Sequence, residues 1–306
     1  MDQRSQSNGL RTYGQQQNKQ QQVEELDEEL LHEMAFDESK AYDYASKLQE
    51  QKDLQADIDS LEALTSEMDS EGMQILHLDT EDAGQAVTMY GELDENTDHV
   101  QTSVPGTGSD LGQTSWNRDR LKAFSGVEDL DDEGAMAEAM EEQNAAAIHW
   151  QGADFPSELH ENLSESVFTE SAKELAGFDH AMNLEIGEET RSSYVGYSAG
   201  GGILGTAVHE DYGVEPDAMT QVGSAGSGIG VESRDDLANP EMEIYWTATR
   251  DDWVHSAGPT VVGYLTEGHT YSRQMDALDA QRIESGTRPA PGDADPEEIG
   301  SSQMRV

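Results

Sequence analysis

Three things are scarce in this 306-residue sequence: cysteine is absent, lysine occurs six times, and no long apolar run is present. The lack of cysteine excludes disulfides, thiol nucleophiles and cysteine-bound metals. A membrane-spanning helix needs roughly 20 apolar residues, and no stretch approaches that length. Residues 1–22 also lack the apolar core of a signal peptide. These absences predict a cytoplasmic protein without a membrane span, or a component of a particle assembled in the cytoplasm.

Acidic residues greatly outnumber basic ones, with 64 Asp and Glu against 17 Lys and Arg and a net charge of −47. Such self-repulsion weakens a compact state in ordinary salt. It is largely screened above about 1 M salt, where the Debye length is about 3 Å. The acidic residues are spread along the whole chain, between clear apolar runs. This pattern favours a protein of an extreme halophile over a partly disordered acidic protein, and it excludes a basic surface for nucleic acid.

The distribution of apolar residues divides the chain into four parts. Residues 1–22 are rich in glutamine and are expected to form a flexible arm. Residues 281–306 are rich in proline, glycine and acidic residues and are expected to form a disordered tail. Residues 23–70 follow a helical period with a narrow apolar stripe. We expect this helical segment to pack on its own domain. The alternative is a contact between chains, giving a homo-oligomer or a larger assembly through residues 23–68. Residues 73–280 form the fourth part.

Strand-like and helix-like runs alternate within this fourth part, which predicts an α/β domain with a mostly parallel sheet covered on both faces. The first two strands are expected to form a hairpin. In the expected helix at 164–183, the side chains of Val167, Leu175, Phe178 and Met182 are expected to face inward. The expected strands are 73–79, 86–93, the start of 99–110, 144–150, 190–198, 217–224 and 242–249, and the clearest helices are 164–183 and 199–210.

Ser198 is the last residue of the expected strand 190–198, directly before the expected helix, and lies between Gly196 and Gly200 in the sequence Gly-Tyr-Ser-Ala-Gly. Ligands of parallel α/β sheets bind beyond the carboxyl ends of the strands. In a nucleophile elbow the serine has a strained backbone, and flanking side chains would collide with the neighbouring strand or helix. The motif alone is not specific, because a structural serine in an inactive relative would look the same. The interpretation therefore depends on the partners of Ser198.

A serine hydroxyl needs a base that is oriented by a third group. Parallel α/β sheets that carry such a serine place the acid and then the histidine later in the chain. Asp251 and Asp252 follow the last predicted strand, and the residues alone leave both as candidates for the acid. His269 is the candidate base. His255 is a second candidate, but it lies so close to Asp252 that we expect it to line the pocket or face solvent.

An oxyanion hole needs two backbone N–H groups near the nucleophile. We expect one from Ala199, at the positive end of its helix, and one from Gly106 or Thr107 in a Pro-Gly-Thr-Gly loop. No metal is expected, because no His-Glu-x-x-His motif occurs. The glycine-rich run at 223–230 lacks the spacing of a dinucleotide site, so no cofactor is expected either.

Over roughly residues 73–273 the sequence resembles an α/β-hydrolase domain family of unknown function found in actinobacterial and haloarchaeal genomes. The likeness lies in ILHLDTEDAGQAVTMYGELDENTDHV, VPGTGSD, IHWQGADFP, GYSAGG, VGSAGSGIGVESRDDL, TRDDWV and EGHTY. The resemblance implies an α/β-hydrolase fold behind an N-terminal helical segment. It also implies Ser198 as nucleophile, Asp252 as acid and His269 as base.

Three positions depart from the family pattern. The family usually has histidine at Tyr197, a bulky residue at Ala199 and proline at Trp253, so the shape of the acyl pocket differs. We expect a serine hydrolase of the esterase or lipase type that acts on a small acyl ester at high salt. The alternative is a structural component of a multi-subunit assembly, such as a virion of a halophilic host, whose site is active or vestigial.

Overall fold

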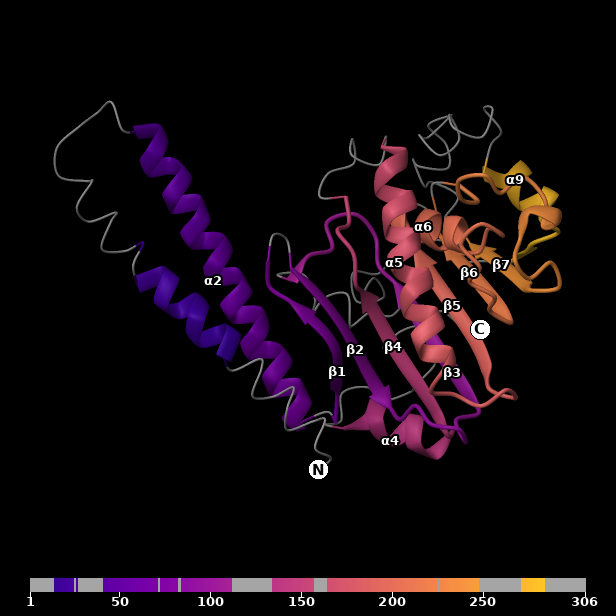
Figure 1. Cartoon of the computed structure of the whole chain (residues 1–306), viewed down its shortest axis with the longest axis horizontal. Coiled ribbons are helices and arrows are strands. Elements are labelled where there is room, and N and C mark those ends of the chain that lie inside the picture. Colours follow the sequence, from indigo (N-terminus) through magenta and orange to yellow (C-terminus); the bar gives the residue numbers. More distant parts are fainter. Residues whose placement is uncertain are drawn as a thin grey trace, which may run out of the picture.

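The computed structural model describes residues 14–24, 26, 41–70, 72–81, 84–111, 134–156, 164–224, 226–247 and 271–283. Within these residues the centre of the molecule is an eight-stranded sheet in the order β1-β2-β4-β3-β5-β6-β7-β8 (Figure 1). The strands β1 and β2 form the expected antiparallel hairpin, β2 pairs antiparallel with β4, and all later pairs are parallel. The predicted mostly parallel α/β architecture is confirmed. The strands are β1 (Gln74–Asp79), β2 (Gln85–Gly91), β3 (His99–Val104), β4 (Ala145–Gln151), β5 (Arg191–Tyr197), β6 (Ala218–Val222), β7 (Glu243–Thr247) and β8 (Gln281–Arg282).

Helices cover both faces of this sheet. Alternate residues of a strand point to opposite faces, and the apolar residues of β2 and β4 accordingly divide between two core clusters. One cluster includes residues of α5 and α6, and the other includes residues of α4 and of the end of α2. Figure 1 shows α2 beyond β1 and α9 beside β7, at opposite ends of the sheet. The described helices are α2 (Ala41–Ser70), α4 (Ala135–Glu142), α5 (Glu165–Asn183), α6 (Ala199–Ala207), a 3-10 turn η4 (Arg234–Asp236) and α9 (Tyr271–Ala277).

The helix α2 packs on its own domain through its second half. Leu61 and Leu64 are fully buried and join the cluster that contains Ile75 and Leu78 of β1. These leucines are three residues apart, so they lie on one side of the helix. The narrow apolar stripe in the sequence is therefore sufficient to cover the edge of the sheet.

The buried face of α5 differs from the prediction at one position. Leu175 and Met182 are buried as expected, and Phe178 is half-buried against the same core. Val167 is only half-buried, whereas Phe168 is 1% exposed. Phe168, Leu175 and Met182 are each seven residues apart, which places them on one face of a 3.6-residue helix. The prediction started this face one residue too early.

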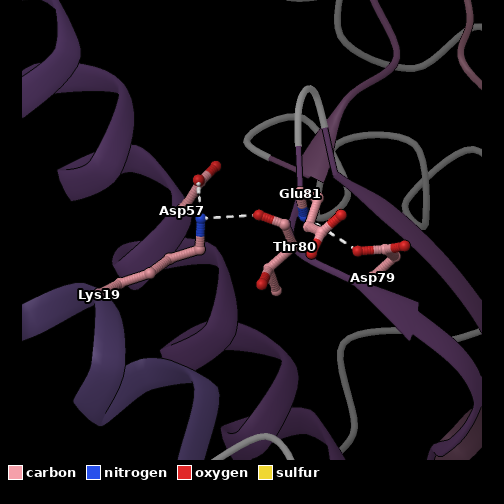
Figure 2. Close-up of polar contacts among 5 residues, drawn as sticks. All are labelled: Lys19, Asp57, Asp79, Thr80 and Glu81. Atoms are coloured by element: carbon pink, nitrogen blue, oxygen red, sulfur yellow. Dashed lines mark hydrogen bonds and ion pairs between the residues drawn. The ribbon is translucent and has the colours of Figure 1, made fainter.

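The segment at residues 14–24 is helical, which differs from the flexible arm expected over residues 1–22. Figure 2 shows how it is held: the Lys19 ammonium donates to Asp57 Oδ2 of α2 at 2.6 Å and to the Thr80 carbonyl at 2.9 Å. The low apolar content of this segment suggested that it has little to bury. It could not reveal an ion pair with a residue 38 positions away.

The first two residues of the expected disordered tail form a strand instead. Gln281 and Arg282 form β8, which pairs with Tyr245 and Trp246 of β7. The Arg282 guanidinium lies 5.1 Å from the centre of the Trp246 ring, a cation–π contact. Such a contact between distant residues is not visible in the local composition of the tail. Residues 1–13 and 284–306 lie outside the described residues.

Candidate active site

Ser198 forms the turn between β5 and α6, at the carboxyl end of a central strand. Its φ is 54° and its ψ is −118°, a conformation that residues with a side chain rarely adopt. Two backbone hydrogen bonds hold it. The Ser198 N–H donates to the Val222 carbonyl of β6 at 2.9 Å, and the Gly201 N–H donates to the Ser198 carbonyl at 3.0 Å. This strand–turn–helix geometry is that of a nucleophile elbow.

The two glycines that flank the serine are required by close backbone contacts. A Cβ atom on Gly196 would lie 2.6 Å from the Cα of Gly201. A Cβ atom on Gly200 would lie 2.1 Å from the carbonyl oxygen of Pro105. Both distances are far shorter than van der Waals contact, which begins near 3.5 Å. The elbow therefore packs against its own helix and against the loop that follows β3.

Gly106 belongs to that loop and touches the elbow directly. A Cβ atom on Gly106 would lie 3.0 Å from the Cβ of Ser198 and 3.1 Å from Cδ1 of Tyr197. Ala199, the first residue of α6, is 2% exposed. The two segments expected to supply oxyanion N–H groups, Ala199 and Gly106–Thr107, therefore both adjoin Ser198.

The loop that carries Gly106 is fixed at two further points. The Gly108 N–H donates to the Pro156 carbonyl at 2.7 Å, which ties the loop to the segment after β4. The Ser109 hydroxyl donates to the Gly106 carbonyl at 2.6 Å and is buried. Gly108 has a φ of +79°, which glycine adopts readily. These bonds hold the backbone near Ser198 in one conformation.

Small residues let α6 lie close to its surroundings. A Cβ atom on Gly201 would lie 2.6 Å from the Ser224 side chain, and one on Gly202 would lie 2.7 Å from the Phe168 ring. Every residue of α6 is buried. The helix that positions the serine is therefore enclosed by the loop after β6 and by α5, and has little freedom to move.

A buried carboxylate anchors α5 to the strand that leads to the elbow. The Tyr194 hydroxyl donates to Asp179 Oδ1 at 2.6 Å, and the Asn183 amide donates to Asp179 Oδ2 at 3.0 Å. Burial raises the pKa of Asp179 above its usual value, although both hydrogen bonds oppose this effect. Burial, followed by the charge of Asp179, raises the pKa of Tyr194 well above its usual value. The pair fixes β5 four residues before Ser198.

The expected partners of Ser198 are not part of the described structure. Asp251, Asp252, His255 and His269 all lie between β7 and α9, outside the described residues. The two ends of this segment are described. β7 ends at the same edge of the sheet as β5, and the Gly223 N–H donates to its last carbonyl, that of Thr247, at 2.8 Å. α9 starts at residue 271.

Three of the described histidines, His99, His149 and His209, are held by contacts within the fold. His149 is fully buried in β4. His99 Nε2 lies 2.9 Å from the Ser193 hydroxyl, and burial lowers the pKa of this imidazole. His209 Nδ1 accepts a bond from the Asp211 N–H at 3.1 Å. Burial or a hydrogen bond within the fold therefore accounts for each of these three side chains.

The structure also contains a buried polar cluster beside the elbow that the sequence analysis did not identify. Gln221 of β6 is fully buried, and its amide donates to the Gly201 carbonyl at 2.8 Å. Buried polar groups normally have hydrogen-bond partners because an unpaired one is costly. Met219 and Gln221 share one face of β6, so a glutamine at a core-facing position was the signal available in the sequence.

Within the described part of the chain, no three His, Asp or Glu side chains converge as a metal site would require. Among the described helices, none combines the length and the apolar character of a membrane span.

Comparison with known proteins agrees with this geometry. The model of the family described as Alpha/beta hydrolase matches residues 79–262, more than half of the chain. Solved structures similar to this chain include a lipase/esterase from Lactobacillus plantarum, which is 12% identical in sequence. The match covers 69% of this chain and 86% of that chain, with a TM-score of 0.37. A dienelactone hydrolase from Anabaena variabilis has 12% identity, 69% and 82% covered, and a TM-score of 0.38. No curated protein matches the chain. Since both TM-scores are below 0.5, the assignment rests on the family model: the chain belongs to the alpha/beta hydrolase family.

Proposed function

We propose that the protein is a serine hydrolase that cleaves small carboxylic esters in molar salt, with Ser198 as nucleophile, His269 as base and Asp252 as acid. One observation carries the proposal: Ser198 has a positive φ at the carboxyl end of β5, directly against the Gly106 backbone. This combination presents a hydroxyl to a bound ligand with backbone N–H groups nearby. A serine in an ordinary glycine-rich loop has no need of either feature.

In the first half of the reaction, the Ser198 hydroxyl attacks the ester carbonyl while His269 accepts its proton. Asp252 holds the imidazole in the required tautomer and stabilises the imidazolium. The negative charge that develops on the carbonyl oxygen is received by the Ala199 N–H and by an N–H of Gly106 or Thr107. His269 then gives the proton to the leaving alcohol, and an acyl ester of Ser198 remains.

In the second half, a water molecule attacks the acyl ester while His269 accepts one of its protons. The same N–H groups receive the oxyanion again. The intermediate collapses, the carboxylic acid leaves, and the proton returns to the Ser198 oxygen. The closed packing around α6 supports this scheme because the nucleophile returns to one position after each cycle.

The length of chain after β7 allows Asp252 to reach the elbow. Strands β5 and β7 are separated by one strand, which corresponds to about 10 Å. Asp252 follows the end of β7 by five residues, and an extended residue spans about 3.5 Å. His269 precedes the start of α9 by two residues. The spacing of Asp252 requires no change in the described fold.

Hydrolysis of short-chain nitrophenyl esters in about 3 M potassium chloride tests the proposal, because salt of this strength screens the net charge. Ser198→Ala and His269→Ala should each lower kcat by about 10⁴-fold or more. Asp252→Asn should have a large effect and Asp251→Asn a small one. The opposite result for the two aspartates would move the acid to Asp251.

The matched control is Ser193→Ala. Ser193 lies on the same strand and also contacts a histidine, since its hydroxyl is 2.9 Å from His99 Nε2. It is not at an elbow, so its removal should leave kcat unchanged. A folded wild-type chain without esterase activity, or a Ser198→Ala variant as active as wild type, would contradict the proposed function.

A further inference from the structure

Two buried glutamines connect the elbow to the helix that follows the proposed base. Gln221 lies on β6 directly beside the elbow strand, where it pairs with Gly196. Its Nε2 donates to two carbonyl groups, that of Gly201 in the first turn of α6 at 2.8 Å and that of Ser227 at 3.3 Å. Gln221 and Ser227 are both fully buried. One side chain thus fixes both the elbow helix and the loop after β6.

The second glutamine continues this connection. The N–H of Ser227 donates to Oε1 of Gln274 at 3.1 Å, and the Gln274 side chain is 6% exposed. Gln274 lies on α9, which begins two residues after His269. We call the set Gln221, Ser227 and Gln274 the glutamine bridge. It runs from the helix of the nucleophile to the helix next to the proposed base.

The backbone around Ser227 leaves little room for the bridge to shift on the side of α6. A Cβ atom on Gly205 of α6 would lie 1.8 Å from the Ser227 carbonyl oxygen. The Ile229 N–H donates to the Thr206 hydroxyl at 2.9 Å, a second bond between this loop and α6. The loop and α6 therefore form one rigid unit, to which α9 is attached through Gln274.

On the side of α9, apolar packing and the hydrogen bond have different roles. Met275 and Leu278 are fully buried in the same core cluster as Ile203 of α6. Apolar burial stabilises the docking but is not directional. A hydrogen bond restricts both distance and angle. The bond to Gln274 therefore selects one position of α9 among those that the apolar contacts allow.

We propose that Gln221 and Gln274 are positioning residues that set the distance between the elbow and the start of α9, the helix that follows the proposed base in the chain. This inference rests on the proposed function of the same site. Catalysis is sensitive to such alignment, since a displacement of about 1 Å can lower a rate by about 100-fold. The bridge contributes to catalysis without contacting the substrate.

The test compares Gln274→Met with wild type at high salt. Methionine keeps the length and apolar body of the side chain but removes the acceptor for the Ser227 N–H. We expect kcat to fall about tenfold to 100-fold with KM within about twofold of wild type. The apparent pKa in the pH profile of kcat/KM should also shift, because the helix next to the proposed base is displaced. Active-site titration counts folded, reactive molecules, so a loss of folded protein cannot imitate these changes.

Two further variants make the result specific. Gln221→Met removes the donor at the other end of the bridge, so it should show the same kinetic pattern even if Gln274→Met fails to fold. Thr206→Val removes a part-buried bond between the same loop and α6, together with the bond from the Thr206 hydroxyl to the Gly202 carbonyl, and neither bond involves α9. It should lower thermal stability and leave kcat and the pH profile unchanged.

The outcomes separate the two proposals. If Ser198→Ala is inactive and both methionine variants keep the wild-type kcat and pH profile, the bridge has no positioning role and the proposed function stands. If Thr206→Val lowers kcat as much as Gln274→Met does, the bridge is not specific and the inference is wrong. A folded wild-type chain that is inactive overturns the proposed function, and the bridge proposal with it.

Discussion

The buried pair of Tyr194 and Asp179 allows one stability prediction to be worked out in detail. Tyr194→Phe removes the hydroxyl that donates to Asp179 at 2.6 Å and keeps the ring, so no large cavity forms. Asp179 keeps its bond from Asn183. A hydrogen bond to a charged group contributes about 1.5–3 kcal/mol. Because Asp179 is only 5% exposed and water cannot replace the lost donor, we expect a loss of about 2–3 kcal/mol in the pH range where Asp179 is charged.

The loss should depend on pH. The folded-state pKa of Asp179 is raised by burial, and the Tyr194 hydrogen bond lowers it. The variant therefore has a still higher folded-state pKa than wild type. Its deficit in unfolding free energy is fully present above these values, where Asp179 is charged, and shrinks as the pH falls through them. The charges of Glu215 and His180 also shift the pKa of this carboxyl. The wild type and the variant both contain these residues, so their effects largely cancel in the comparison.

Urea unfolding in molar potassium chloride, at the highest and at the lowest pH where the wild-type chain stays folded, measures both effects. Tyr245→Phe is the matched control, because its hydroxyl also donates to a carboxylate, that of Glu243 at 3.0 Å, but this bond is exposed. We expect a change below about 0.5 kcal/mol in the control. The reasoning is refuted if Tyr194→Phe loses no more than Tyr245→Phe, or if its loss is the same at both pH values.

Three further predictions concern the elbow, the N-terminal helix and the charge. Gly200→Ala should destabilise the fold by more than about 3 kcal/mol in thermal unfolding, whereas Gly177→Ala, on an open helix position, should stabilise it by about 0.5–1 kcal/mol. Lys19→Met should make residues 14–24 sensitive to limited proteolysis, and Lys173→Met, an exposed control, should not. The Tm of the wild-type chain should be higher in about 3 M than in about 0.1 M potassium chloride, because salt screens the net charge; a Tm independent of salt would contradict the halophilic interpretation.

The strands and the elbow could be predicted from sequence because their signals are local. The run Ala-Ala-Ala-Ile-His-Trp reads as a strand buried on both faces, and every residue of β4 is buried. Ser198 could be placed at a strand end because glycines flank it at the required spacing. In each case the residues that carry the signal are neighbours in the chain, so periodicity and turn chemistry are sufficient.

The elements that were missed depend on contacts between distant residues. The helix at 14–24 is held by Lys19 through Asp57 and Thr80, and β8 is held through Arg282 on Trp246. The glutamine bridge joins α6, the loop after β6 and α9 through bonds that span 20 and 47 positions. No local pattern marks the partner of such a residue. A polar side chain at a core-facing strand position, as at Gln221, shows only that a partner must exist.

Covalent labelling of the folded wild-type chain tests the central claim most directly. A fluorophosphonate probe reacts with a serine that is activated by a base and faces an oxyanion hole. In about 3 M potassium chloride, mass spectrometry of the digested protein should find one probe per chain, on the peptide that contains Ser198. The label should be absent from Ser198→Ala and from heat-unfolded protein. A native, folded chain that remains unlabelled, or that is labelled equally after Ser198→Ala, would contradict the account.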